Sequence, residues 1–173
     1  MFALPERYDV RIRFHGVIPM AMRGQAVPRA KRVNTLRDVD REARRLGLPF
    51  GRIFDPIGEG ATRCLAVSEH AIDVGRERAF VLAAGRAIWA EGVEVATDAG
   101  LRPVCEEAGL DWAACAAAIE DPALAARVDA NTQALLDLHH WGVPVTVFGT
   151  DRFWGQDRIE DLERALEDAG LRR

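Results

Sequence analysis

The sequence is poor in cysteine and lacks the spacing that most thiol chemistry requires. It has three cysteines, Cys64, Cys105 and Cys115, and no two of them form a CxxC motif. A zinc ribbon and a dithiol redox motif both need that spacing, and an odd number of cysteines does not suit a disulfide framework. We therefore expect all three to be small buried hydrophobic side chains, and we expect no metal site.

Long hydrophobic runs and an excess of positive charge are also absent. No apolar run approaches the roughly 18 residues of a membrane helix, and "MFALPERYDVRI" lacks the basic start, apolar centre and cleavage site of a signal peptide. The formal net charge is -4, which gives no electrostatic reason to expect nucleic acid or an anionic membrane as a partner. We expect a soluble, cytoplasmic protein with neither partner.

The hydrophobic content of 49% predicts one domain with a proper core, or one domain that carries a large insertion. Residues 8–18 alternate apolar and polar side chains, which predicts a strand with one covered face and His15 on its polar side. The long segment 34–138 is helical by period and composition, with a helix stop at Gly47 and a helix start at Asp121. Two stripes have helical spacing: Leu36, Val39, Ala43 and Leu46, and Phe80, Ala84, Ala87 and Ile88.

The C-terminal part returns to strands and then ends in a helix. Residues 143–148 alternate around three valines, "GTD" turns the chain, and "RFW" predicts the partner strand of a hairpin. "DRIE" reads as a capping box with Asp157 at the N-cap, and Gly170 supplies the helix stop. Because an isolated hairpin is only marginally stable, we expect the hairpin and residues 8–18 to share one sheet.

A proline near the front of the valine run needs an explanation. Pro144 has no N–H to give to a strand ladder. A cis bond after Val143 is uncommon enough to suggest a specific role, while a trans proline on an edge strand is the ordinary alternative. The residues alone leave both open.

Several separate motifs resemble one family, in the family order. They are "GVP", a hairpin and "FWGQDR", preceded by "PRAKR", "RDVDREARRLGLPF" and "AGRAIWAEG", and together they cover most of residues 5–168. The sequence resembles the 2-hydroxychromene-2-carboxylate isomerases, relatives of kappa-class glutathione transferases and DsbA-like thioredoxins. The resemblance implies an α/β fold in which a thioredoxin-like sheet is interrupted by a large all-helical insertion. It places the thioredoxin-like domain at 1–24 and 139–173, N-terminally incomplete, and the helical insertion domain at 25–138.

The resemblance also implies glutathione as cofactor and a set of residues that bind it. Pro144 corresponds to the cis-proline beside the active site, and Val143 turns its backbone toward the thiol substrate. Gln156 and Asp157 lie where related transferases hold the γ-glutamyl end, at a helix start that suits a carboxylate. The structural alternatives are that Asp157 serves only as N-cap and that Trp154 is a core anchor.

The segment 23–45 carries eight Lys or Arg against three acids. The usual explanation for such a run is a solvent-exposed helix face. The more specific alternative is a positive electrostatic field that attracts the carboxylates of glutathione or of an aromatic acid. The family places basic residues here, so Lys31 and Arg32 become substrate-binding candidates, with Asn34 as a further polar candidate. The adjacent His139 and His140 predict capping or surface roles.

The start of the chain departs from the family. Met1 aligns near the end of the first family helix, so the first strand and the loop with the serine that bonds the glutathione sulfur have no counterpart. Three explanations compete: a start site placed too far downstream, a strand borrowed from a partner, or a degenerate non-catalytic relative. We favour the first. No residue is assigned the serine's catalytic role.

The function that the resemblance implies is a glutathione-dependent isomerase acting on an aromatic carboxylic acid in aromatic-compound catabolism, and it allows a homodimer. The alternative is a non-catalytic thioredoxin-like binding or interaction module. A DsbA-type oxidoreductase is disfavoured because no cysteine pair with CxxC spacing exists to exchange.

Overall fold

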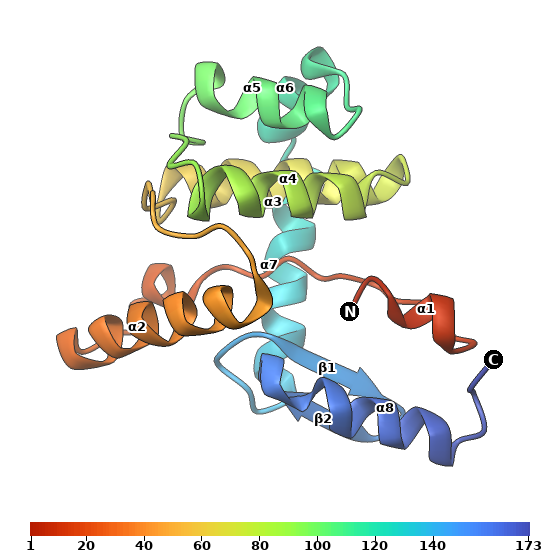
Figure 1. Cartoon of the computed structure of the whole chain (residues 1–173). Coiled ribbons are helices and arrows are strands. Elements are labelled where there is room, and N and C mark those ends of the chain that lie inside the picture. Colours follow the sequence, from red (N-terminus) through yellow and green to blue (C-terminus); the bar gives the residue numbers. More distant parts are fainter. The chain divides into compact units, whose positions relative to one another are not determined.

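The computed structural model describes residues 1–173, and its elements divide between two compact units. The hairpin unit comprises Met1–His15 and Thr132–Arg173, and the helical unit comprises Gly16–Asn131. The domain limits expected from the sequence stay a prediction. In chain order the elements (Figure 1) are α1 (Leu4–Arg7), the 3-10 helix η1 (Met20–Arg23), α2 (Arg29–Leu46), α3 (Glu59–Asp73), α4 (Glu77–Trp89), α5 (Asp98–Glu107), α6 (Trp112–Ile119), α7 (Pro122–Asp137), β1 (Val145–Phe148), β2 (Asp151–Trp154), the 3-10 helix η2 (Gln156–Arg158) and α8 (Ile159–Asp168).

The helical unit has its core among α3, α4, α5 and α6. Phe80 is its largest fully buried side chain, and Leu101 and Val67 lie in the same cluster. The predicted stripe on α4 is confirmed, because all four of its members are buried. The predicted start of α7 is confirmed too, since the Ala123 N–H donates to the Asp121 side chain at 2.8 Å.

Helix α2 forms and ends at Gly47 as predicted, where a φ of 65° suits a residue without a side chain. Its apolar stripe is nevertheless largely uncovered. Leu36 and Leu46 are 48% and 56% exposed, and Ala43 alone among the residues of this helix is buried. The spacing of apolar residues therefore predicted the helix correctly, but it did not predict that the apolar face of this helix stays exposed.

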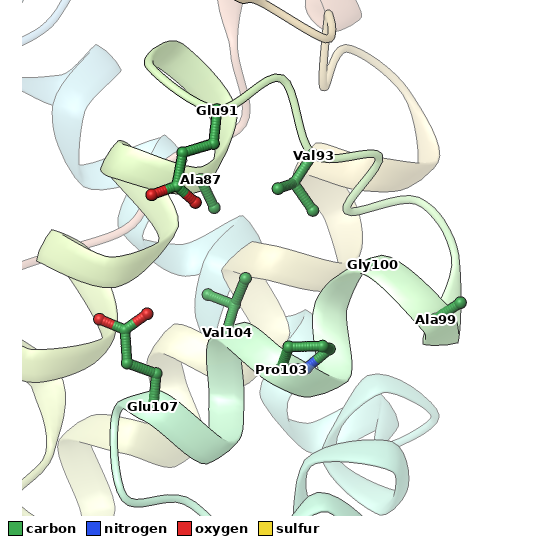
Figure 2. Close-up of a pocket in the computed structure, with 8 residues that line it drawn as sticks. All are labelled: Ala87, Glu91, Val93, Ala99, Gly100, Pro103, Val104 and Glu107. Atoms are coloured by element: carbon green, nitrogen blue, oxygen red, sulfur yellow. The ribbon is translucent and has the colours of Figure 1, made fainter. Parts of the chain in front are cut away.

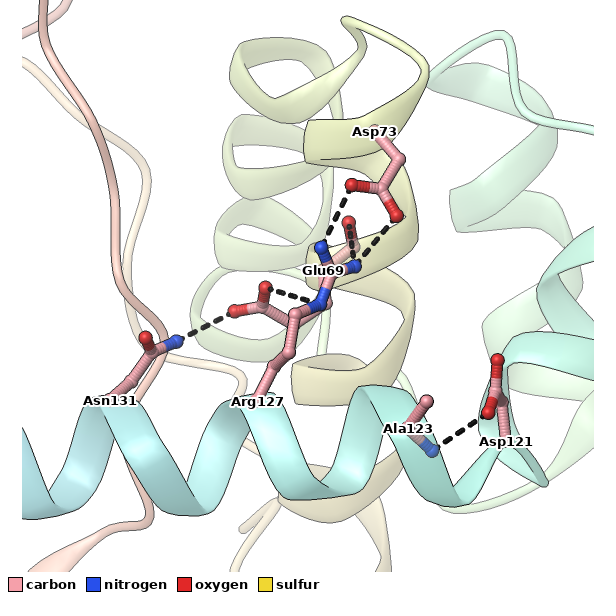
Figure 3. A network of polar contacts seen from close by, with 6 residues as sticks. All are labelled: Glu69, Asp73, Asp121, Ala123, Arg127 and Asn131. Carbon is pink, nitrogen blue, oxygen red and sulfur yellow. Dashed lines mark hydrogen bonds and ion pairs between the residues drawn. The ribbon is translucent and has the colours of Figure 1, made fainter.

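A buried carboxylate joins α3 to the N-terminal part of α7 (Figure 3). Glu69 is 4% exposed; it accepts a hydrogen bond from Asn131 Nδ2 at 2.9 Å and lies 3.5 Å from Arg127 Nε. Arg127 also donates to both oxygens of Asp73, at 2.9 and 2.6 Å, and lowers the pKa of that carboxyl. A buried charge needs such partners, so this network is structural.

The hairpin unit contains the two-stranded sheet. β1 and β2 are antiparallel, with Val145 opposite Trp154 and Phe148 opposite Asp151, which confirms the predicted hairpin. Phe148 and Phe153 pack on a core made by residues of α1 and α8 together with Tyr8. The buried members of that core are Leu4, Tyr8, Leu162 and Leu166.

The predicted strand at residues 8–18 is wrong, and so is the sheet it was expected to share. This segment contributes one isolated bridge, between Tyr8 and Arg172, and is otherwise irregular. Its alternation is real, since Val10 and Ile12 pack on the hairpin-unit core while Arg11 and Arg13 are exposed. Alternation reports one covered face, whereas a strand also needs a hydrogen-bonded neighbour, which residues 11–13 do not have.

The predicted capping box is also wrong. α8 begins at Ile159 with Arg158 as its N-cap, and no side chain caps it. The chain makes the 3-10 turn η2 first, so Asp157 lies within that turn, two residues ahead of the helix. The predicted C-terminal stop at Gly170 is confirmed by its φ of 71°.

The core of the helical unit makes a stability prediction. Phe80→Ala should lower the free energy of unfolding by about 3–5 kcal/mol, because it removes a buried ring and leaves a cavity. Leu82→Ala, on the same helix but at a side chain 54% exposed, should cost less than about 1 kcal/mol. Urea unfolding of both variants checks this, and equal losses would contradict the assignment of the core.

Candidate functional site

The Val143–Pro144 peptide bond, just before β1, is cis, as the resemblance implied. The Pro144 carbonyl accepts a 2.9 Å hydrogen bond from the Gly155 N–H, just after β2. This bond lies one residue beyond the last strand pair, Val145 with Trp154. It therefore ties the two segments that flank the hairpin to each other.

The four predicted glutathione-binding residues lie in these two segments. Val143 and Pro144 precede β1, and Gln156 and Asp157 open η2. The Pro144–Gly155 hydrogen bond brings the two pairs together, and all four residues are exposed. Their roles in binding stay a prediction.

Three residues at this site have backbone groups without a hydrogen-bond partner in the protein. Val143, which is 60% exposed, makes no backbone hydrogen bond. The N–H groups of Gln156 and Asp157 donate to nothing, as expected at a helix start. The site therefore offers backbone donors beside the Asp157 carboxylate, which is 70% exposed and 3.6 Å from Arg158.

Gly155 determines how the second segment turns. Its φ of 117° and ψ of 153° belong to a region that only glycine adopts readily. A Cβ atom here would also collide with Asp157 Oδ1. The exposed Asp157 side chain can rotate away from an added Cβ, so it is the φ and ψ that favour glycine between Trp154 and the predicted binding residues.

Trp154 is not the core anchor that was expected, because its side chain is 46% exposed. Its ring contacts His140, at a centroid distance of 5.6 Å, and Trp141, at 5.4 Å. The sequence reasoning missed Trp141 altogether and gave the histidine pair only capping or surface roles. The sequence did contain an indication of these contacts, because the aromatic run "HHW" directly precedes the "GVP" motif. His139, with φ 61°, follows the end of α7.

The predicted substrate-binding residues belong to the helical unit. Lys31, Arg32 and Asn34 lie in the first two turns of α2, and all three are exposed. The acids of α2 pair further along the helix, with Arg41, Arg44 and Arg45. The substrate roles of Lys31, Arg32 and Asn34 stay a prediction.

The three cysteines are free. The expected burial is confirmed for Cys105 and Cys115 but not for Cys64, which is only partly buried in the structure. Cys105 and Cys115 are fully buried and hydrogen-bond to each other, and burial raises the pKa of both thiols. Burial also raises the pKa of Cys64 to about 12. Thiolates are thus disfavoured throughout, and no group of side chains could hold a metal ion.

A cavity of about 270 Å³ lies beside α4 and α5 in the helical unit. Its lining is largely apolar, with Glu91 and Glu107 at one side (Figure 2). Arg86 donates to Glu91 at 2.9 Å and also binds Glu107. Both carboxylates are therefore already paired with a cation, and the cavity is a weaker candidate than the hairpin-unit site. No helix of the structure has the length and apolar character to cross a bilayer.

Comparison with known proteins supports the family expected from the motifs. Residues 4–167 match the model of the DSBA-like thioredoxin domain. A 2-hydroxychromene-2-carboxylate isomerase of Pseudomonas putida is 31% identical over 88 residues, which are 51% of this chain and 43% of the relative. The enzyme of the same name from Pseudomonas sp. (strain C18) is also 31% identical over 88 residues, 51% of this chain and 42% of the relative. The matched part thus spans less than half of each curated relative.

Solved structures confirm the predicted fold class. A 2-hydroxychromene-2-carboxylate isomerase superposes with a TM-score of 0.70 at 21% identity, covering 97% of this chain and 84% of that one. A putative protein disulfide isomerase from Nitrosomonas europaea gives a TM-score of 0.64 at 24% identity, covering 84% of this chain and 76% of that one. At these identities the likeness shows the fold, which is thioredoxin-like and mostly helical.

Gly155 can be tested by substitution. Gly155→Ala should lower the free energy of unfolding by about 1–3 kcal/mol, because alanine is strained at this φ and ψ. Gly149→Ala is the matched control, since its φ is also positive but nothing lies within 4 Å of an added Cβ; it should cost about 1 kcal/mol. Thermal and urea unfolding compare the two, and a harmless Gly155→Ala would contradict the assigned geometry.

The raised thiol pKa predicts a loss of stability in alkali. Folding raises the pKa of Cys64 from 9.0 to about 12, so its contribution is complete below about pH 9 and is lost as the pH rises toward 12. Unfolding free energies should fall more steeply above pH 9 in the wild type than in Cys64→Ala. Parallel pH profiles would show that Cys64 is not buried as described.

Proposed function

The chain belongs to the DSBA-like thioredoxin domain family, and from this premise we propose that it is a glutathione-dependent isomerase that acts on an aromatic carboxylic acid. The curated relatives that bear the name 2-hydroxychromene-2-carboxylate isomerase support the reaction class. The hydrogen bond between Gly155 and Pro144 is the observation that carries the proposal. It gathers two exposed segments that offer the backbone groups of Val143, the N–H groups of Gln156 and Asp157, and the exposed Asp157 carboxylate.

The residues present fit glutathione chemically. Glutathione has an amide backbone, two carboxylates and an ammonium group. The unpaired Val143 backbone groups can bind its amides as a short strand would. The N–H groups of Gln156 and Asp157 suit a carboxylate at a helix start, and the Asp157 carboxylate suits the ammonium group.

In this proposal the chain binds glutathione and orients it toward the substrate. Bound glutathione supplies a thiol that serves as a reversible nucleophile toward the conjugated acid. The backbone of Val143 holds the part of glutathione next to its thiol, and the Asp157 carboxylate holds the ammonium group at the γ-glutamyl end. The cysteines are poor candidates for the nucleophile, because desolvation raises the pKa of all three thiols. No side chain of this chain is assigned the task of activating the thiol.

A glutathione titration tests the proposal. Calorimetry should show saturable binding that Asp157→Ala weakens about tenfold, because a charge-assisted hydrogen bond is lost. Asp168→Ala removes an exposed carboxylate from the far end of α8 and should leave the affinity unchanged. The same preparations should isomerise 2-hydroxychromene-2-carboxylate only when glutathione is present.

Two outcomes would contradict the proposal. Absence of saturable binding, or equal affinity in Asp157→Ala, would remove the assigned glutathione site. Binding without any isomerase activity would favour the alternative, a thioredoxin-like binding module.

A further inference from the structure

The hairpin has one face packed and one face open. Phe148 and Phe153 pack on the hairpin-unit core. Residues opposite each other in an antiparallel pair share a face, and neighbours along a strand alternate. The register of Val145 with Trp154 and Val147 with Arg152 therefore places these four side chains on the other face. There Val147 is 49% exposed and Trp154 is 46% exposed.

Trp154 is held in place although it is exposed. Trp141 meets its ring at an interplanar angle of 71° and His140 at 62°. A Cβ atom on Gly142 would lie only 3.3 Å from Trp154 Cζ2, so the backbone of Gly142 runs close to the indole. An exposed indole fixed by its neighbours offers a planar surface at little cost in side-chain entropy.

Arg152 supplies a positive charge on the same face. It is exposed and forms no ion pair, whereas the C-terminal arginines Arg158, Arg164, Arg172 and Arg173 all pair with carboxylates. Arg11 and Arg13 of the same unit are likewise exposed without an ion pair, but they do not lie on the hairpin. Two residues along a strand span about 7 Å. With their Cα atoms about 7 Å apart on one face, the two side chains can both contact a ligand that has a planar ring and a carboxylate on it.

We propose that this open face is the subsite for the acidic substrate: the ring lies on Trp154 and the carboxylate pairs with Arg152, with Val147 beside them. Gly155 directly follows Trp154 and binds Pro144, so the subsite adjoins the segments proposed to hold glutathione. The choice of an aromatic acid as occupant rests on the proposed function. A second copy fits less well, because two-fold pairing of this face would set Arg152 against its counterpart.

Direct binding of three small probes tests the subsite without turnover. The probes are 2-naphthoate, the uncharged 2-naphthamide, and cyclohexanecarboxylate, which has the charge but no aromatic ring. Calorimetry on the wild type should rank 2-naphthoate first. Arg152→Gln should weaken 2-naphthoate about two- to fivefold and leave 2-naphthamide unchanged, while Trp154→Leu should weaken both naphthalene probes by about two- to tenfold.

Matched variants control for nonspecific effects. Arg164→Gln changes an exposed arginine of α8, and Trp89→Leu changes a tryptophan 42% exposed in the helical unit. Neither should alter any affinity. Circular dichroism and thermal unfolding confirm that each variant is folded, and Arg152→Gln carries the test alone should Trp154→Leu unfold.

The outcomes separate this inference from the proposed function. Unchanged 2-naphthoate affinity in folded Arg152→Gln overturns the subsite, even if the chain proves to be a glutathione-dependent isomerase. Loss of 2-naphthoate binding in both variants supports the subsite, even if no isomerase activity is found. Sedimentation that shows a dimer dissociated by Trp154→Leu, with 2-naphthoate affinity unchanged, would assign the face to self-association and overturn the inference.

Discussion

The candidate site depends on one backbone hydrogen bond, from the Gly155 N–H to the Pro144 carbonyl. It closes the open end of the hairpin opposite the Gly149 turn, and it joins segments eleven positions apart in the chain. Val143 on one side and Gln156 with Asp157 on the other are neighbours because of it. Glycine is required at one end of the bond, since no other residue readily adopts the φ of Gly155.

The same hairpin explains why binding groups gather in this unit. One face is fixed by burial against α1 and α8, so the register of the strands decides what the other face shows. That face carries an indole, two valines and a guanidinium, and the end of the hairpin carries free backbone donors. The helical unit contributes the larger core but no comparable cluster.

Sequence patterns predicted the helices and the hairpin better than they predicted what those elements bury. Apolar residues three and four apart on α4 predicted a face that is buried in the core. The same spacing on α2 belongs to a face that stays exposed. In residues 8–18 the alternation reported one covered side but could not report whether a neighbouring strand exists. Asp157 looked like an N-cap because the intervening 3-10 turn has no sequence signature as clear as a capping box.

The candidate site was predicted only where the family motif reached. Val143, Pro144, Gln156 and Asp157 came from the "GVP" and "FWGQDR" motifs, and the structure brings them together. Arg152 and Trp141 were missed because their importance depends on strand register and on a ring contact between distant residues. Neither follows from composition, period or spacing along the chain.

Backbone amide chemical shifts during a glutathione titration test the central claim most directly. The account predicts saturable shifts of the Val143, Gln156 and Asp157 amides with one common affinity. Saturable shifts confined to the helical unit, or the absence of any shift at those three amides, would contradict it.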